Sequence, residues 1–154
     1  MIPFKAEQTI DRPADDVWAY AADMARHARW MNVLEVRSVD GAPTVVGTRA
    51  VERIRFGPRE VDVELEVAES IPAKRISWRT TGRGPMKAVA TLDLDAIEPD
   101  RTRAVWSGSI GLTGLWRLLE PMMAGEVRAG EDAELRRLKE QLESDAATGS
   151  TAAS

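Results

Sequence analysis

Two glutamates set among apolar residues are candidates for acid–base chemistry in this sequence. Glu52 falls on the apolar face of a predicted strand, and Glu126 falls on the last predicted helix. Desolvation in an apolar pocket raises the pKa of a carboxyl group, so either residue could act as a general acid or base or anchor a ligand. Alternatively, Glu52 lies near the open end of its strand and reaches water. The cost of burying an unpaired carboxylate favours that alternative.

His27 is the only imidazole in the chain. It lies on a predicted short helix with Arg26 and Arg29, where it could hydrogen-bond a ligand or take part in catalysis. A lone histidine on an arginine-rich helix is more typical of a solvated surface. The sequence therefore leaves His27 as a weak catalytic candidate beside Glu52.

The residue types exclude several kinds of chemistry. The chain has no cysteine, which excludes disulfides, thiolate nucleophiles and cysteine-bound zinc. No serine stands in a recognisable Ser-His-Asp setting, and the turn at residues 82–85 lacks the spacing of a phosphate-binding loop. We therefore expect no metal, nucleotide or other cofactor.

Length and charge bound the class of protein. The chain has 154 residues, with 25 acidic and 21 basic side chains and a net charge of −4. That length fits one domain with room for a core or an internal cavity, and the acidic balance argues against a nucleic-acid partner. No segment resembles a signal peptide or reaches the ~18 apolar residues of a membrane span, so we expect a soluble, cytoplasmic protein. Small polar residues predict a disordered tail at 144–154, after a domain at 1–143.

Hydrophobic periodicity predicts one strand, two short helices, six strands and a long helix, in that order. The first helix begins at Pro13, because a proline loses no hydrogen bond in the first turn of a helix. Pro121 predicts a kink or break near the start of the last helix. The predicted strands cover residues 4–10, 34–38, 47–56, 61–67, 76–80, 86–97 and 101–110, and the last helix covers residues 115–142.

Two hairpins can be aligned from the sequence. A four-residue loop at 57–60 places apolar residues opposite one another and arginines opposite acidic residues. The resulting pairs are Phe56 with Val61, Ile54 with Val63, Glu52 with Leu65, Ala50 with Val67, Arg55 with Asp62 and Arg53 with Glu64. The turn at 98–100 likewise brings Leu92 opposite Trp106. We interpret the arginine–carboxylate pairs as a solvated outer face of the sheet.

Several local motifs resemble one known group of proteins. The segments concerned are 9–18, with its strand-Pro-helix entry; Trp30, after the second helix; 46–49, at a strand opening; 71–76, with its proline turn; and 114–121, from glycine to proline. In order and content these segments resemble the SRPBCC (START-like) superfamily, which includes the birch-pollen allergen family and the polyketide cyclase/dehydrase and lipid-transport group. The resemblance covers about residues 3–143.

The resemblance implies an α+β helix-grip fold, in which a curved antiparallel sheet of about seven strands wraps around a long C-terminal helix and two short helices follow strand 1. It also implies binding or transport of a small hydrophobic ligand of lipid, polyketide or aromatic type in an internal cavity. Two alternatives stay open: a cyclase/dehydratase-like enzyme that uses Glu52 or His27, and a chaperone-activator-like interaction module. A dry, close-packed core is the competing interpretation of the same apolar residues.

We expect the ligand-binding residues to be those on the inner face of the sheet and on the last helix. They are Trp30, Ile54, Phe56, Val63, Leu65, Trp78, Leu92, Trp106, Leu118 and Met122. The tryptophans could stack on a ring-containing ligand and donate their indole N–H groups to it. Exposure of Leu135 or Trp116 on the last helix would suit a homodimer.

Overall fold

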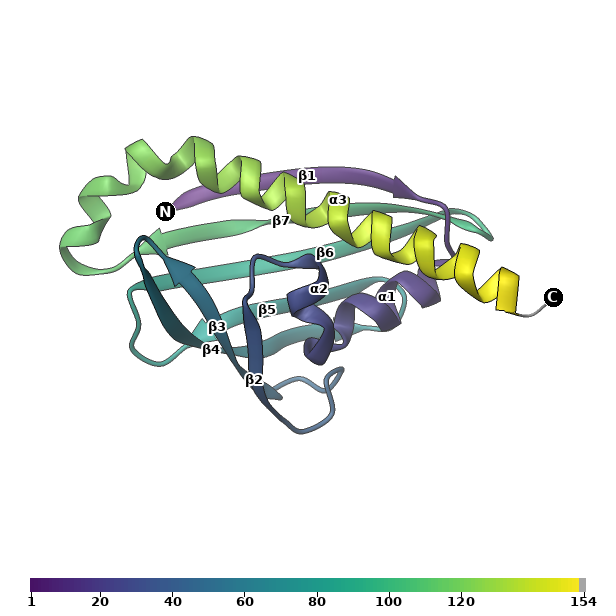
Figure 1. Cartoon of the computed structure of the whole chain (residues 1–154), viewed down its shortest axis with the longest axis horizontal. Coiled ribbons are helices and arrows are strands. Elements are labelled where there is room, and N and C mark those ends of the chain that lie inside the picture. The colour runs from purple at the N-terminus through teal and green to yellow at the C-terminus, as the bar shows by residue number, and fades with distance from the viewer. Residues whose placement is uncertain (153–154) are drawn as a thin grey trace.

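A seven-stranded antiparallel sheet and one long helix form the frame of the protein in the computed structural model (Figure 1). The structure describes the backbone of residues 1–152 and the side chains of residues 1–145. The strand order is β1-β7-β6-β5-β4-β3-β2. The strands are β1 (Ile2–Ile10), β2 (Glu35–Asp40), β3 (Arg49–Phe56), β4 (Arg59–Ile71), β5 (Arg75–Thr81), β6 (Met86–Glu98) and β7 (Arg101–Leu112). The predicted fold, with its six-stranded meander after two short helices, is confirmed.

Two short helices follow β1, as predicted: α1 (Ala14–Ala22) and α2 (His27–Trp30), separated by the 3-10 turn η1 (Met24–Arg26). Pro13 occupies the N-cap position of α1, where its backbone oxygen accepts the N–H of Asp16, and the Asp23 carboxylate accepts a hydrogen bond from the backbone N–H of Ala25 at the start of η1. These caps satisfy N–H groups that a helix leaves free at its first turn. Figure 1 shows α1 and α2 beside the same face of the sheet as the long helix.

The register of β3 and β4 corrects the sequence prediction by two residues. Phe56 pairs with Arg59 rather than with Val61, so the loop contains only Gly57 and Pro58. Gly57 has a φ of +60°, which suits the first position of a tight hairpin turn, and the fixed φ of proline suits the second. The other pairs shift equally, to Ile54 with Val61, Glu52 with Val63, Ala50 with Leu65, Arg55 with Glu60 and Arg53 with Asp62.

The shift by two leaves every side chain on its predicted face. Arginines still meet carboxylates on the outer face: the Arg53–Asp62 pair is at 3.2 Å and the Arg55–Glu60 pair at 3.4 Å. These side chains are largely exposed, so each pair adds little to stability. The predicted pairing of Leu92 with Trp106 in the β6–β7 hairpin is confirmed.

Gly108 allows β6 and β7 to approach closely. A Cβ atom at this position would lie 1.9 Å from the backbone oxygen of Val89 and 3.0 Å from the Cα of Ala90. No larger residue could occupy that space without moving the backbone of the neighbouring strand. Ala88 and Ala90 on β6 also have only small side chains on the concave face of the sheet.

The long helix α3 (Glu120–Ala152) crosses the concave side of the sheet and lies along β1 (Figure 1). The break predicted at Pro121 falls where the 3-10 helix η2 (Gly114–Leu119) gives way to α3. A proline there is in the first helical turn, where it needs no N–H partner. The helical backbone continues beyond residue 143, where the sequence predicted a disordered tail at 144–154; residues 153–154 lie outside the described residues.

One side of α3 packs against the end of the core beside α1. Leu135, Leu138 and Leu142 are at most 1% exposed and pack with Ile10 and Val17. Leu135 is therefore unavailable for the dimer contact suggested from the sequence, whereas Trp116 on η2 is 51% exposed. No helix among the described residues is long and apolar enough to cross a membrane.

Candidate functional site

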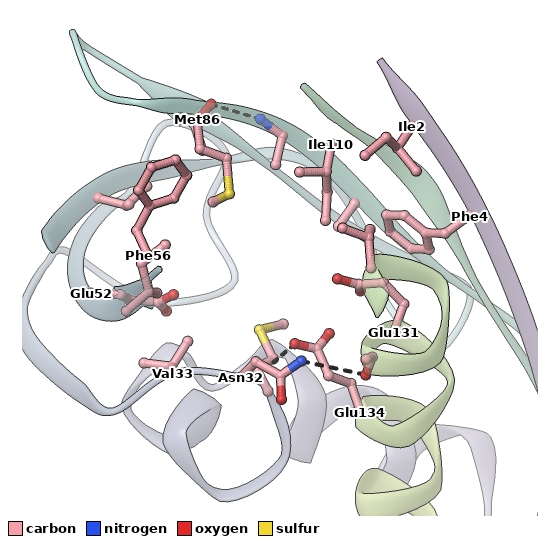
Figure 2. Close-up of a pocket in the computed structure, with 18 of the residues that line it drawn as sticks. Ile2, Phe4, Asn32, Val33, Glu52, Phe56, Met86, Ile110, Glu131 and Glu134 are labelled. Carbon is pink, nitrogen blue, oxygen red and sulfur yellow. Dashed lines mark hydrogen bonds between the residues drawn. The ribbon is translucent and has the colours of Figure 1, made fainter. Parts of the chain in front are cut away.

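A cavity of about 310 Å³ lies between the concave sheet and α3 (Figure 2). Its wall is largely apolar, with a few polar side chains, as is usual for small-molecule sites. The apolar wall contains Ile2, Phe4, Met31, Val33, Ile54, Phe56, Val63, Leu65, Trp78, Met86, Ala88, Ala90, Trp106, Ile110, Leu112, Met123 and Val127. Among the polar wall residues are Asn32, Glu52, Arg55, Arg79, Thr80, Glu126, Glu131 and Glu134. A cavity, rather than a dry core, therefore occupies this side of the sheet.

Six of the ten predicted ligand-binding residues line this cavity. They are Ile54, Phe56, Val63, Leu65, Trp78 and Trp106. Trp30 and Leu92 are fully buried but do not belong to the wall, because they pack in the closed part of the core beside α1 and α2. Trp30 still contacts the wall indirectly, since its ring centroid is 5.3 Å from that of Trp106.

The prediction that Leu118 and Met122 face the cavity is wrong. Their exposed fractions are 77% and 81%, and neither belongs to the wall. The prediction placed residues 115–142 in an α-helix with a kink or break near Pro121, but the residues before that point, up to Leu119, form a 3-10 helix, which has fewer residues per turn. The faces of the following helix are therefore rotated, and Met123 and Val127 line the cavity instead.

Glu52 and His27 are brought together, against the expectation that each would reach water. Glu52 is 4% exposed and lines the cavity, and His27 is fully buried behind it. The Nδ1 atom of His27 and the Oε1 atom of Glu52 form a hydrogen bond. The hydrogen bond with His27 compensates the free-energy cost of burying the Glu52 carboxyl group. The sequence alone did not reveal that the two residues are partners.

The imidazole of His27 is enclosed by two of the predicted tryptophans. Its ring lies edge-on to Trp78, with centroids 4.8 Å apart, and edge-on to Trp30, with centroids 6.0 Å apart. Among the described side chains, His27 Nε2 and the indole Nε1 atoms of both tryptophans are buried without a hydrogen-bond partner. Trp78 also lines the cavity, while its indole Nε1 atom is buried.

Two glutamates on α3 that sequence reasoning missed form the most polar part of the wall. Glu131 and Glu134 are 8% and 6% exposed. The indole N–H of Trp106 donates to Oε2 of Glu131 over 2.8 Å and to Oε2 of Glu134 over 3.3 Å. The backbone N–H of Asn32 donates to Oε1 of Glu134 over 2.6 Å. Figure 2 shows both carboxyl groups on the cavity side of α3.

Burial raises the pKa of both carboxyl groups. For Glu134 the pKa is raised well above its usual value, first by desolvation and then by the neighbouring charge and hydrogen bond of Glu131. For Glu131 the pKa is raised by desolvation and partly lowered again by hydrogen bonds from Glu134 and Trp106. Two carboxyl groups in this relation hold one proton between them over the intermediate pH range.

A signal for this pair was present in the helical spacing. Glu131 lies four residues before Leu135, and Glu134 lies four residues before Leu138. Residues four apart share a face of an α-helix, so both glutamates lie on the apolar stripe that the leucines define. Glutamates interrupting an apolar stripe are candidates for buried groups. Glu126, the helix residue considered from the sequence, also lines the cavity but is exposed.

The site can enclose an apolar molecule and offer it hydrogen bonds at two places. One is the carboxyl group of Glu52, held by His27, and the other is the Glu131–Glu134 pair across the cavity wall. Both places could also exchange a proton with a bound molecule. No three His, Asp or Glu side chains among the described residues are placed to hold a metal ion.

Comparison with known proteins gives one family over nearly the whole chain. The family described as "Polyketide cyclase / dehydrase and lipid transport" matches residues 1–143. A search of curated proteins found no match.

Solved structures with the same fold are numerous, and their sequence identity to this chain is low. A protein from Thermus thermophilus superposes with a TM-score of 0.72 at 19% identity, covering 93% of this chain and 98% of its own. The Zhui aromatase/cyclase from Streptomyces sp. R1128 superposes with a TM-score of 0.76 at 15% identity, covering 92% of this chain and 93% of its own. The di-domain aromatase/cyclase BexL, from the BE-7585A biosynthetic pathway, superposes at 0.65 and 17% identity, covering 93% of this chain and 47% of its own. At these identities the likeness concerns the fold.

Proposed function

The chain belongs to the polyketide cyclase/dehydrase and lipid transport family, and on that premise we propose that it binds a small hydrophobic molecule in the cavity under α3. The observation that carries this proposal is the cavity of about 310 Å³ with a largely apolar wall. Apolar walls favour a ligand whose transfer from water is driven by the hydrophobic effect. The polar side chains at Glu52 and along α3 would orient that ligand.

Ligand binding can be tested with a neutral aromatic probe, because Trp78 and Trp106 both line the cavity. We expect 1-naphthalenemethanol to change the tryptophan fluorescence in a saturable way. Native mass spectrometry of freshly purified protein should in addition reveal any molecule that copurifies with the chain. The absence of both saturable binding and a copurifying molecule would contradict the proposal.

A matched pair of variants separates cavity binding from adsorption elsewhere on the protein. Ala88 lies on β6 in the cavity wall, and Ala96 lies exposed on the same strand. Ala88→Phe fills the cavity and should weaken binding of the probe at least tenfold, whereas Ala96→Phe should leave it unchanged. Equal loss, or no loss, in the two variants would place the probe outside the cavity.

A second candidate function is a cyclase/dehydratase-like enzyme. The specific observation in its favour is the hydrogen bond that holds the Glu52 carboxyl group in the cavity wall against His27. A carboxyl group fixed in this way suits proton transfer to or from a bound carbonyl compound. Under this proposal Glu52→Gln abolishes turnover of a poly-β-carbonyl substrate while binding of the neutral probe changes less than threefold. Unchanged turnover in Glu52→Gln would exclude this role of Glu52.

The partner of the chain under either proposal is a small hydrophobic molecule. Three statements about the protein stay predictions from the sequence: that it is located in the cytoplasm, that it has no nucleic-acid partner and that it forms a homodimer.

A further inference from the structure

The Glu131–Glu134 pair forms a hydrogen-bond acceptor site on the wall of the cavity. Both carboxyl groups receive the same indole N–H of Trp106, so their Oε2 atoms adjoin. The remaining oxygen of Glu134 accepts the backbone N–H of Asn32. No N–H donor among the described residues reaches Oε1 of Glu131. The pair therefore keeps one carboxyl oxygen available to a molecule in the cavity.

The charge of the pair has no direct cationic partner among the described residues. Arg137 is the basic residue that acts on both carboxyl groups electrostatically. Its guanidinium donates to the backbone oxygen of Trp30 and to Oδ1 of Asn32 rather than to either glutamate. Ionisation of either carboxyl group puts a negative charge in a poorly solvated place. A buried charge of this kind is stabilised strongly by a cation in contact with it.

The other charges on the wall leave the cavity acidic. Glu126 adds a further carboxylate on the same helix. The two arginines of the wall are engaged by carboxylates of the sheet: Arg55 with Glu60 at 3.4 Å and Arg79 with Glu66 at 2.6 Å. An anionic ligand would therefore meet repulsion at the Glu131–Glu134 pair, whereas a cationic ligand would meet attraction.

Aromatic rings beside the pair suit a cation as well. Phe4 and Trp106 both line the cavity, with ring centroids 5.9 Å apart. The faces of such rings attract ammonium groups. The ring of Trp78, which also lines the cavity, lies with its centroid 6.1 Å from that of Trp106.

We propose that the Glu131–Glu134 pair is a cation-binding subsite and that the ligand of this cavity is a hydrophobic molecule carrying a protonated amine. The ammonium group donates to Oε1 of Glu131 and to the adjoining Oε2 atoms of the pair, while the apolar body of the ligand lies against the sheet. This inference rests on the proposed cavity-binding function and narrows its ligand class.

Three naphthalene probes that differ in one substituent test the inference: 1-naphthylmethylamine, 1-naphthalenemethanol and 1-naphthoic acid, each titrated at pH 7 by calorimetry. We expect the amine to bind at least tenfold more tightly than the alcohol, and the acid to bind most weakly. Equal affinities of amine and alcohol, or a preference for the acid, would overturn the subsite while leaving the cavity function standing. Failure of all three probes to bind would overturn both.

Variants test whether the preference for the amine over the alcohol depends on the Glu131–Glu134 pair. In Glu131→Gln and in Glu131→Gln/Glu134→Gln the amine should lose its advantage, while the alcohol binds within threefold of its original affinity. Glu140 lies exposed on the same helix, so Glu140→Gln provides the charge-matched control and should retain the full preference. A preference that survives in both Glu131 variants would overturn the assignment. Binding of the alcohol also reports that each variant is folded.

Discussion

The indole N–H of Trp106 on β7 reaches Oε2 of Glu131 on α3 over 2.8 Å, and this contact joins the concave sheet to the long helix. It lies beside the cavity, and it satisfies both a buried donor and a buried carboxyl group. The cavity thus stays open at a place where the sheet and the helix are held together by a polar contact rather than by packing alone.

Replacing Trp106 by Phe should destabilise the protein by about 1–3 kcal/mol, because the change removes the donor and leaves buried carboxyl oxygens unsatisfied. Urea unfolding at pH 7 measures the change in the free energy of unfolding. Trp116, which is 51% exposed, gives the matched control: Trp116→Phe should change stability by less than about 0.5 kcal/mol. Equal effects of the two substitutions would contradict the structural role of this hydrogen bond.

Stability should fall with rising pH because of the Glu131–Glu134 pair. The pKa of each group is raised in the folded state above the ordinary value of 4.5. Between that value and the raised pKa, the folded state binds more protons than the unfolded state, so the free energy of unfolding decreases as pH increases. Below 4.5 the cost of burying the charge is absent, and above the raised pKa it is fully present.

To isolate this effect, the free energy of unfolding is measured as a function of pH for the original protein and for Glu134→Gln, and the second curve is subtracted from the first. We expect the difference to decline from pH 4.5 up to the raised pKa and to level off above it. Other ionisable groups near the pair or on the cavity wall are Asp132, Arg137, Glu126, Glu52, Arg55 and Arg79, and His27 lies behind Glu52. These groups are present in both proteins, so their contributions largely cancel. A flat or rising difference would contradict the raised pKa.

The register error in β3 and β4 has a simple physical origin. Alternation with a period of two determines which face a side chain occupies, but it cannot distinguish a strand from the same strand slid by two residues. Charge does not help, because acidic residues recur at every second position from Glu60 to Glu66. Arg55 therefore finds a carboxylate in either register. The deciding factor was the turn, where Gly57 and Pro58 suffice.

The site was harder to predict than the fold because it depends on contacts distant in sequence. The strand faces placed Trp78 and Trp106 in the cavity wall correctly, since alternation is a local property. The partnership of His27 with Glu52 arises only when α2 is packed on the sheet. The orientation of α3 likewise depends on where the 3-10 turn ends, so the choice between Met122 and Met123 could not be made from periodicity.

The Glu52–His27 hydrogen bond should couple the two residues energetically. Either His27→Phe or Glu52→Leu alone leaves a buried polar partner uncompensated and should cost about 3–5 kcal/mol. The double variant removes both groups, so its loss should be smaller than the sum of the single losses by at least about 1 kcal/mol. Urea unfolding of the four proteins gives the coupling. Additive losses would mean that the two side chains do not stabilise each other.

Gly108 should tolerate no side chain. A Cβ atom at this position would lie 1.9 Å from the backbone oxygen of Val89, so Gly108→Ala should force β6 and β7 apart and cost more than about 3 kcal/mol. Gly125 on α3 has no atom within 4 Å of such a Cβ. Gly125→Ala should therefore stabilise the helix by about 0.5–1 kcal/mol. Thermal melts followed by circular dichroism compare the two, and a tolerated alanine at 108 would contradict the close approach.

Trp116 on η2 should control how fast a ligand enters the cavity. Its ring meets that of Phe56 edge to face, with centroids 5.7 Å apart, and Phe56 belongs to the cavity wall. Such a contact between half-exposed rings contributes about 0.5–1.5 kcal/mol, which opening of this side of the cavity would have to overcome. In Trp116→Ala we expect association and dissociation of 1-naphthalenemethanol to accelerate together by several-fold, with the equilibrium affinity changed less than threefold.

Stopped-flow fluorescence measures both rates, and Leu115→Ala, which removes an 86% exposed side chain next to Trp116, is the control. Unchanged rates in Trp116→Ala, or equal acceleration in Leu115→Ala, would mean that the ligand enters elsewhere.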